Sequence, residues 1–552
     1  MQLCCTPQRV QLFALFVATI TIVGVLIILF LFNYPTFARH RILDAVVFKD
    51  GSQEMERFKT TAELVNLRMS IYVYTVTNAD EVVKSSSKIN LKEIGPFVYH
   101  EYKSKEFVDN NQVTGLITYK LRKRYTFLPD QSIGDPTVMN ITWPNVPLIA
   151  ARSVLDNLPF FERQAAYMLM NNAIKSKSEP AFITDTVENF IFDGSKRELF
   201  ESLQNSFPFS LLKPWPLPDN KFAIFYDKNN TWYSWRDHLF TTSAGFGTNQ
   251  DYHNLNQYIY MNQSATLPYW RKEPAQCNQI NGTDGQFFAP FMDKTQNIMV
   301  YSADICRKVS LKYRHNFDLS RVTVYKYTLD EKDLLSGTKN PENDCYCLQR
   351  DKDDNPLPEC QLDGLMDLSS CVAPNVVASG AHFLYGSPEL WTRIAGISPP
   401  NATVDEPVIY AEPNTGLSIQ VKVPIQLNIR LDRGGFNLFN FFQEDKPLII
   451  PLFYGVEAAE LTEDQASLLR SKLLLLDSWF VSMVLGGAIV LILAIGAAAA
   501  VLCMRFRGSR QARTASETEP LLSSTNSNQA NSANQQGGDN QSGNQANTYQ
   551  TI

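Results

Sequence analysis

Two long runs of mainly apolar residues, without any charged residue, lie near the two ends of the chain. The first run extends from Val10 to Phe32 and the second from Trp479 to Met504. A helix needs roughly 20 apolar residues to cross a bilayer core of about 30 Å, and both runs are longer than that. The sequence therefore predicts two transmembrane helices, residues 10–32 and 479–504, with a large segment, residues 33–478, between them.

The flanking residues predict the side of the membrane on which each part lies. The first run is too long for the apolar part of a signal peptide, and no A-x-A cleavage pattern closes it, so we expect it to remain as an anchor. Four arginines follow the second run and place the tail, residues 505–552, in the cytosol; they are Arg505, Arg507, Arg510 and Arg513. Two spans then return residues 1–9 to the cytosol and leave residues 33–478 on the lumenal or extracellular side.

Between the spans the periodicity is mainly that of β-strands. Short runs rich in β-branched and aromatic residues are separated by Gly, Pro, Asn or Asp, which is typical of an antiparallel sheet. Helical patterns interrupt them near 161–177, near 195–207 and before the second span, where Thr462 and Gln465 have capping-box spacing. We expect an α+β fold, one β-rich domain with helical insertions. The strand-like runs are YVYTVTNADEV, GPFVYHEY, GLITYKLRKRYTFL, KFAIFYDKNNTWY, RVTVYKYTL and SIQVKVPIQLNIRL.

Glycosylation and cysteine patterns both indicate an oxidising compartment for this β-rich domain. N-x-S/T acceptor sequences are used only on the lumenal or extracellular side, and they occur here at Asn140, Asn229, Asn262, Asn281 and Asn401. An even number of cysteines is clustered nearby: Cys277, Cys306, Cys345, Cys347, Cys360 and Cys371. No paired C-x-x-C knuckles support a zinc site, so disulfides are predicted. The residues alone leave 15 pairings open.

The three remaining cysteines flank the predicted spans on the cytosolic side. They are Cys4, Cys5 and Cys503. Reversible palmitoylation and plain free thiols are the two interpretations of cysteines in this position.

Composition and motifs give no indication of catalysis. A net charge of −6 offers no basis for binding nucleic acid, and no nucleophile elbow, zinc-protease helix, P-loop or dinucleotide fingerprint occurs. His100 and Glu101 are adjacent, but neighbours on a strand face opposite sides. The acidic run RDKDDNP, residues 350–356, lacks the glycine and terminal glutamate of a calcium loop and is expected to be a solvated turn. We therefore predict no enzyme, no cofactor and no metal.

Several segments together resemble one family. They are NADEV followed by IGPFVYHEY, then WPNVPLIAA, TVENFIFDG, FYDKNNT, YSADICRKV and the six clustered cysteines, all between two spans. In order and spacing they resemble the class B scavenger receptor family, to which the fatty acid translocase and lysosomal integral membrane protein type 2 belong. The resemblance implies an irregular antiparallel β-barrel, capped by an apical helical bundle and pierced by an apolar tunnel that runs toward the bilayer. It also implies the disulfides Cys277–Cys345, Cys306–Cys371 and Cys347–Cys360, with a Cys345–Cys347 ring as the rival.

The same resemblance makes the helix near 161–177 an apical helix. Its expected apolar face consists of Phe161, Ala165, Met168 and Leu169. Lys175 and Lys177 at its end resemble the paired lysines that hold anionic ligands in the family, although a helix C-terminus favours cations in any case. The histidine that lysosomal members use on this helix as a pH switch is absent.

The cytosolic tail carries two candidate sorting signals. In ETEPLL, Glu517 precedes Leu521 and Leu522 in the acidic dileucine form. In NTYQTI, Tyr549 and Ile552 fit the tyrosine-based form, in which an extended peptide adds to an adaptor edge strand. A terminal PDZ ligand is the rival for the second signal, but Gln550 occupies its key position. We expect clathrin adaptors to recognise this tail and deliver the protein to endosomal and lysosomal membranes, with a plasma membrane share left open.

The expected function is that of a lipid conduit. The protein would bind cholesterol, another sterol, a fatty acid or a phospholipid and pass it through the tunnel to the membrane, because a lipid needs an apolar path shielded from water. The alternatives are a sorting receptor for a lysosomal hydrolase and a cell-surface scavenger receptor for lipoprotein or other anionic ligands. A homo-oligomer also stays open. The six histidines lie outside the predicted apical helices, which favours the conduit over a receptor that releases its cargo in acid.

Overall fold

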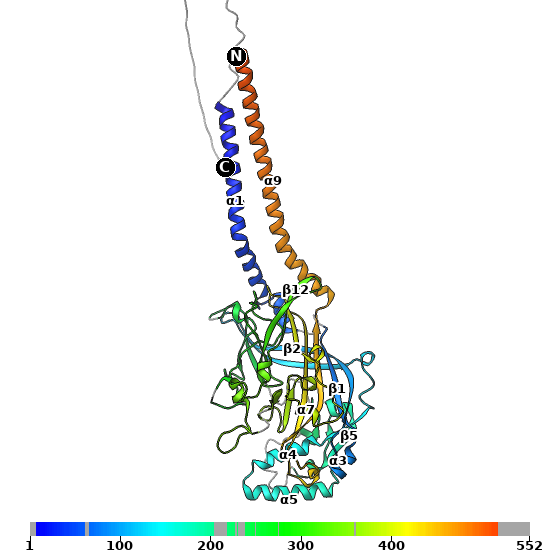
Figure 1. Cartoon of the computed structure of the whole chain (residues 1–552). Helices are drawn as coiled ribbons and strands as arrows, with labels where there is room; N and C mark the ends of the chain where they lie inside the picture. Colours follow the sequence, from blue (N-terminus) through cyan, green and yellow to red (C-terminus); the bar gives the residue numbers. More distant parts are fainter. Residues whose placement is uncertain are drawn as a thin grey trace, which may run out of the picture. The chain divides into compact units, whose positions relative to one another are not determined.

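The computed structural model divides the chain into two compact units (Figure 1). One unit combines Met1–Phe32 with Val481–Ile552, and the other is Asn33–Phe480. We call the second one the β-rich unit. The structure describes residues 7–60, 66–203, 218–226, 229, 238–248, 250–273, 275–357, 360 and 362–516.

Two long helices carry the apolar runs. Helix α9, Glu463–Ser516, contains the apolar stretch Phe480–Met504, which is long and apolar enough to cross a membrane. Helix α1, Pro7–Val46, contains Pro35, and its segments Ala18–Phe30 and Phe32–Val46 meet the same test only together, as a pair bent by 43°. Among the described residues, then, one unbroken helix could span a membrane, and the first predicted span remains a prediction. The cap predicted for α9 is present, because Gln465 N donates to Thr462 Oγ1 at 3.4 Å.

The β-rich unit is built around one 13-stranded antiparallel sheet within the described residues. Its main path runs in the order β10-β11-β12-β15-β16-β17-β1-β2-β3-β8-β9, and the short pair β13 and β14 joins it at β16. The strands are β1 Arg68–Val76, β2 Leu91–Asn111, β3 Leu116–Phe127, β8 Leu239–Ser243, β9 Tyr258–Met261, β10 Ile298–Ser302, β11 Arg307–Leu319, β12 Val322–Leu329, β13 Leu365–Asp367, β14 Val376–Ser379, β15 Val408–Ala411, β16 Ser418–Leu431 and β17 Leu448–Glu460.

The two ends of this path, β9 and β10, are joined through a short segment at Gly282–Thr283. Tyr258 N on β9 donates to Gly282 O at 3.0 Å, and Thr283 N donates to Met299 O on β10 at 3.1 Å. Gly282 has φ +111°, and a Cβ there would lie 2.9 Å from the backbone of Met299, so a side chain would push the two strands apart. The sheet is therefore a nearly closed barrel, as predicted.

Strand predictions hold where β-branched and aromatic residues are dense. The run SIQVKVPIQLNIRL is β16 from its first residue to its last. Two expectations were wrong at their edges. In the first run the strand ends at Val76, and Ala79 begins helix α3, Ala79–Ser85, because Asp80 and Glu81 suit the first turn of a helix. In KFAIFYDKNNTWY the described residues 221–226 form only β7, Lys221–Phe222, and a turn.

Helices and short strands surround the barrel. The helices are α2 Gln53–Lys59, α4 Val146–Asp156, α5 Phe160–Ser176, α6 Glu198–Leu203, α7 Glu389–Thr392 and α8 Ala402–Asp405. Two small sheets pair β4, Asn140–Pro144, with β5, Phe182–Thr186, and β6, Ser195–Lys196, with β7. Single-turn segments are η1 Pro129–Gln131, η2 Asn189–Asp193, η4 Pro218–Asn220, η5 Tyr252–Asn254, η6 Ala275–Asn278, η7 Glu331–Leu334, η8 Pro341–Tyr346, η10 Ala381–Phe383 and η11 Asn437–Phe439.

Helices α4 and α5 lie at the end of the β-rich unit that is far from its α1 residues, 33–46 (Figure 1). The predicted apolar face of α5 is covered only in part, with Ala165 and Leu169 half-buried. Ala166, Met170 and Ile174 are buried, whereas Phe161 is 83% and Met168 63% exposed. Periodicity alone did not distinguish these two faces, since large apolar side chains occur on both.

A partly buried histidine connects segments that are far apart in the sequence. His382 in η10 lies between Asp405 on α8 and Glu93 on β2, with 3.0 Å from Nδ1 to Oδ1 and 3.0 Å from Nε2 to Oε2. Tyr454 on β17 donates to the same glutamate at 2.8 Å, and Tyr74 on β1 also faces it. Burial opposes the charged imidazolium, but the two carboxylates outweigh it and raise the pKa of His382.

This arrangement predicts a stability contribution that is larger in acid. Because the pKa of His382 is raised in the folded protein, its ion pairs stabilise fully below the unfolded histidine pKa of about 6.5, and this contribution is lost as pH rises through the folded value. We expect His382→Gln to lower the free energy of unfolding by about 1–3 kcal/mol at pH 5, and by less at pH 8. Melting temperatures of both proteins from pH 5 to pH 8 test this.

The matched control is His253→Gln, since His253 pairs with Asp251 at an exposed site. It should change the melting temperature little at any pH. A deficit of the His382 variant that stays constant or grows as pH rises would contradict the expectation.

Candidate functional site

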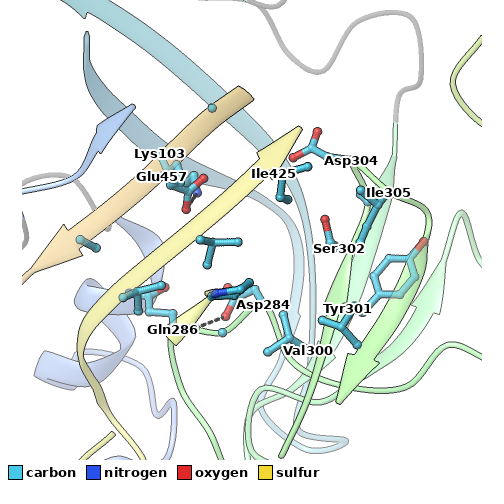
Figure 2. A pocket seen from close by; sticks show the side chains of 18 of the residues that line it. Lys103, Asp284, Gln286, Val300, Tyr301, Ser302, Asp304, Ile305, Ile425 and Glu457 are labelled. Atoms are coloured by element: carbon cyan, nitrogen blue, oxygen red, sulfur yellow. Dashed lines mark hydrogen bonds and ion pairs between the residues drawn. The ribbon is translucent and has the colours of Figure 1, made fainter. Parts of the chain in front are cut away.

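A cavity of about 430 Å³ lies inside the barrel (Figure 2). Its wall comes mainly from alternate residues of neighbouring strands, because side chains along a strand point to opposite faces in turn. On β16 the odd-numbered positions from Ile419 to Leu427 line it, and on β17 those from Phe453 to Ala459 do so. Most of the wall is aliphatic or aromatic, including Leu121, Ile425 and Phe453.

Four charged side chains line part of this mostly apolar wall, and Glu101 lies beside two of them without lining the cavity. We call the five residues Glu101, Lys103, Lys123, Asp304 and Glu457 the charge belt. Lys103 Nζ lies 2.6 Å from the carboxylate of Glu457 and 3.6 Å from that of Glu101. Lys123 Nζ lies 3.3 Å from Asp304 and 3.7 Å from Glu101. The charges therefore alternate in sign from one end of the belt to the other.

Glu101 is the central member of the charge belt and the most deeply buried. Its side chain is 0% exposed, and Tyr125 OH donates to Oε1 at 3.4 Å. No described residue donates a hydrogen bond to its Oε2. Burial raises the pKa of Glu101 although both lysines lower it. At Lys103 burial works the other way, but the neighbouring carboxylates of Glu101 and Glu457 outweigh it and raise the pKa of the lysine.

A second ion pair lies in the same wall. Lys105 Nζ is 2.6 Å from Asp284 Oδ2 and 3.3 Å from Gln286 Oε1, and it sits 3.5 Å from the ring centroid of Phe58. Burial lowers the pKa of Lys105, and it opposes ionisation of Asp284, whose pKa is nevertheless lowered by the lysine. The other lining cation, Arg57, is held by Glu54 at 2.8 Å. Each cation of the cavity wall thus has a carboxylate beside it.

The sequence of this chain is similar to those of known proteins. The model of the CD36 family matches residues 16–504, which is most of the chain. This protein belongs to the CD36 family. Its members are class B scavenger receptors and membrane glycoproteins, so the family predicted from the sequence motifs is confirmed.

Two kinds of curated relative are similar to this CD36-family chain at comparable levels. Sensory neuron membrane protein 1 of Heliothis virescens is 28% identical over 454 residues, 77% of this chain and 80% of that protein. Lysosome membrane protein 2 of Rattus norvegicus is 26% identical over 462 residues, 82% and 87% of the two chains. Lysosome membrane protein 2 of Homo sapiens is 24% identical over 488 residues, 86% and 91%.

The disulfides of this CD36-family protein have the pairing that the resemblance implied. Cys277 is bonded to Cys345, Cys306 to Cys371 and Cys347 to Cys360, so the structure does not contain the rival ring Cys345–Cys347. Two of the three bridges connect parts of the sequence that are 65 and 68 residues apart. These two bridges covalently link the long segment between β12 and β14 to the rest of the β-rich unit.

The predicted lysines do not belong to the cavity. Lys175 is exposed in the last turn of α5, and Lys177 follows the helix, 3.8 Å from Glu198 Oε2. Neither lines the cavity wall. Their role in ligand binding therefore remains a prediction that concerns the surface of α5.

The remaining predicted sites are surface or tail residues. Four of the five acceptor asparagines are exposed, while Asn281 is half-buried and accepts from Gln257 Nε2 at 2.6 Å. Cys503 is exposed and free. Cys4, Cys5 and the sorting residues Glu517, Leu521, Leu522, Tyr549 and Ile552 lie outside the described residues.

The charge belt was not predicted from the sequence. The signal was present in HEYKSK, where Glu101, Lys103 and Lys105 alternate along β2. Alternating charges on a strand are usually assigned to the solvent face. Here these side chains lie on the same face of β2 as Phe97 and Tyr99, which are buried in the barrel interior. Their burial is tolerated because Asp304, Asp284 and Glu457 form ion pairs with the lysines of the wall.

Proposed function

We propose that this CD36-family protein binds lipids in the barrel cavity and passes them to the membrane that anchors it. The observation that carries the proposal is the cavity itself, which is apolar over most of its wall and lies inside the barrel. Its volume is within the roughly 300–1,000 Å³ typical of ligand sites. Burying each methylene of an alkyl chain there contributes about 0.8 kcal/mol. Mass spectrometry of lipids that co-purify with the glycosylated protein tests the proposal, and a protein free of lipid would argue against it.

A second candidate is a receptor for a protein ligand at α5. Phe160, Phe161 and Met168 are 59%, 83% and 63% exposed, and exposed apolar patches often mark contact surfaces. A relative is called lysosome membrane protein 2, which makes a lysosomal hydrolase a candidate partner. Capture of lysosomal hydrolases by the wild-type protein, and not by Phe161→Asp, at pH 7 or pH 5 would favour this candidate.

We also propose that the chain crosses the membrane twice, with both of its ends in the cytosol. Supporting observations are the helix Phe480–Met504, the apolar residues of α1 and the five acceptor asparagines of the β-rich unit. We expect glycosidase treatment to lower the apparent mass. Protease added to sealed vesicles should remove only the tail. A mass unchanged by glycosidase, or a β-rich unit digested from the cytosolic side, would refute this topology.

Filling the cavity should stop lipid transfer. Ile425 lines the wall on β16, and Ile425→Trp adds an indole to the space a ligand would occupy. Extra volume typically costs about 1–3 kcal/mol even in a packed core, and here it enters a cavity, so the variant should fold and reach its usual membrane. We expect transfer of a labelled lipid from donor vesicles to the host membrane to fall at least tenfold.

The matched control is Ile425→Val, which changes the same position by removing one methylene. It should lose about 0.5–1.5 kcal/mol of stability and retain transfer. Transfer at the wild-type rate through Ile425→Trp would rule out the cavity as the path.

Delivery to endosomes and lysosomes is proposed from the two tail signals. Tyr549→Ala removes a ring that an adaptor pocket would bury, and Leu521→Ala with Leu522→Ala removes the dileucine pair. Truncations at such anchor residues commonly cost 2 kcal/mol or more, roughly a thirtyfold loss of affinity. We expect either change to move part of the protein to the cell surface and both together to move most of it, measured by surface biotinylation. A wild-type surface fraction in the combined variant would show that neither signal operates.

A further inference from the structure

We propose that the charge belt is the head-group site of the cavity, and that it selects amphiphiles with an uncharged hydroxyl head over fatty acids with the same tail. This inference rests on the proposed function, because it assumes that the cavity holds an amphiphile. It adds the position of the head group and the chemical class of the ligand. A long-chain alcohol is the simplest member of that class.

Every cation among the described residues of the cavity wall is already paired with a carboxylate of the protein. Four cations line the cavity: Arg57, Lys103, Lys105 and Lys123. Each lies within 3.3 Å of a protein carboxylate. A fatty acid that bound one of these cations would place its carboxylate beside the protein carboxylate that already pairs with it, and the two like charges would repel each other.

The charge of the belt as a whole also disfavours an anion. The belt contains three carboxylates, Glu101, Asp304 and Glu457, and two ammonium groups, Lys103 and Lys123. Three negative and two positive charges leave one negative charge, and protonation of Glu101 would leave none. In neither state does the belt carry the positive excess that attracts an anion into an apolar cavity.

The carboxylates of the belt can still accept hydrogen bonds. An ionised carboxylate has about four lone-pair sites, so an ion pair with one lysine does not exhaust it. Glu457 and Asp304 both line the cavity, with 29% and 47% of their side chains exposed (Figure 2). A hydroxyl head can donate to Glu457 while its alkyl tail lies against Ile425 and Leu427. A cationic head would match the charge, but its transfer from water into this apolar space is costly.

The test compares three amphiphiles that share a tail and differ in the head group. Full-length glycosylated protein in lipid nanodiscs binds tritiated hexadecan-1-ol at pH 8, and unlabelled hexadecan-1-ol, hexadecanoate and hexadecylamine compete for it. Empty nanodiscs correct for partition into lipid. We expect hexadecan-1-ol to compete at least about tenfold better than either of the other two.

The selectivity should follow the charge of the belt. Glu457→Gln keeps the shape of the side chain and removes one negative charge, which leaves two carboxylates and two ammonium groups. We expect hexadecanoate to gain at least about fivefold relative to hexadecan-1-ol. Asp304→Asn makes the same change in charge at a more exposed position and serves if the first variant does not fold. Glu460→Gln, on the exposed end of the same strand, is the matched control and should leave the ratio unchanged.

The outcomes separate this inference from the proposed function. If none of the three amphiphiles binds, or if Ile425→Trp binds hexadecan-1-ol as well as the wild type does, the cavity is not the lipid site and the proposed function fails. If they bind in the cavity but hexadecanoate or hexadecylamine competes best, the head-group preference is wrong while the function stands. The head-group preference is equally wrong if both belt variants leave the ratio of hexadecanoate to hexadecan-1-ol unchanged.

Discussion

Hydrogen bonding between the two ends of the large sheet, through Gly282 and Thr283, determines whether this protein has an interior at all. An open antiparallel sheet would leave unpaired backbone groups on β9 and β10 and would expose its inward side chains to water. The joining segment approaches the backbone of Met299 so closely that only glycine fits at position 282. Once the barrel is nearly closed, its alternate residues face each other across a space that they do not fill, and a cavity remains.

Buried charge is the second constraint, and it follows from the first. Charges inside a barrel are tolerated only when each has a partner, because the loss of hydration costs several kcal/mol per ion. The charge belt, the Lys105–Asp284 pair and the His382 cluster all meet this condition by joining strands that are distant in sequence. Such pairs stabilise the fold little compared with apolar packing. They favour one register of the strands that they join. They also supply polar groups to an otherwise apolar cavity.

Membership of the CD36 family accounts for the architecture without naming a ligand. Relatives called sensory neuron membrane protein 1 and lysosome membrane protein 2 are about equally similar to this chain. The proposed functions concern two separate regions of the protein. The protein ligand proposed above would contact the exposed apolar side chains of α5, and the proposed lipid would lie in the cavity. The predicted lysines belong to the first region and the charge belt to the second, so a binding measurement on one of them does not report on the other.

Local sequence patterns determine several elements of this protein independently of tertiary contacts. The two apolar runs, the strand β16, the helix α5 and the cap of α9 are readable from the sequence because hydrophobic spacing and capping residues act over a few positions. Which face of α5 is buried was not readable, since Phe161 and Met168 are as apolar as Met170 and Ile174. The charge belt depends on residues far apart in the chain: Lys103 and Glu457 meet because β2 and β17 both pair with β1, and Lys123 on β3 meets Asp304 beyond β10. Alternation placed Glu101, Lys103 and Lys105 on one face of β2, and only the closure of the barrel decided that this face points inward.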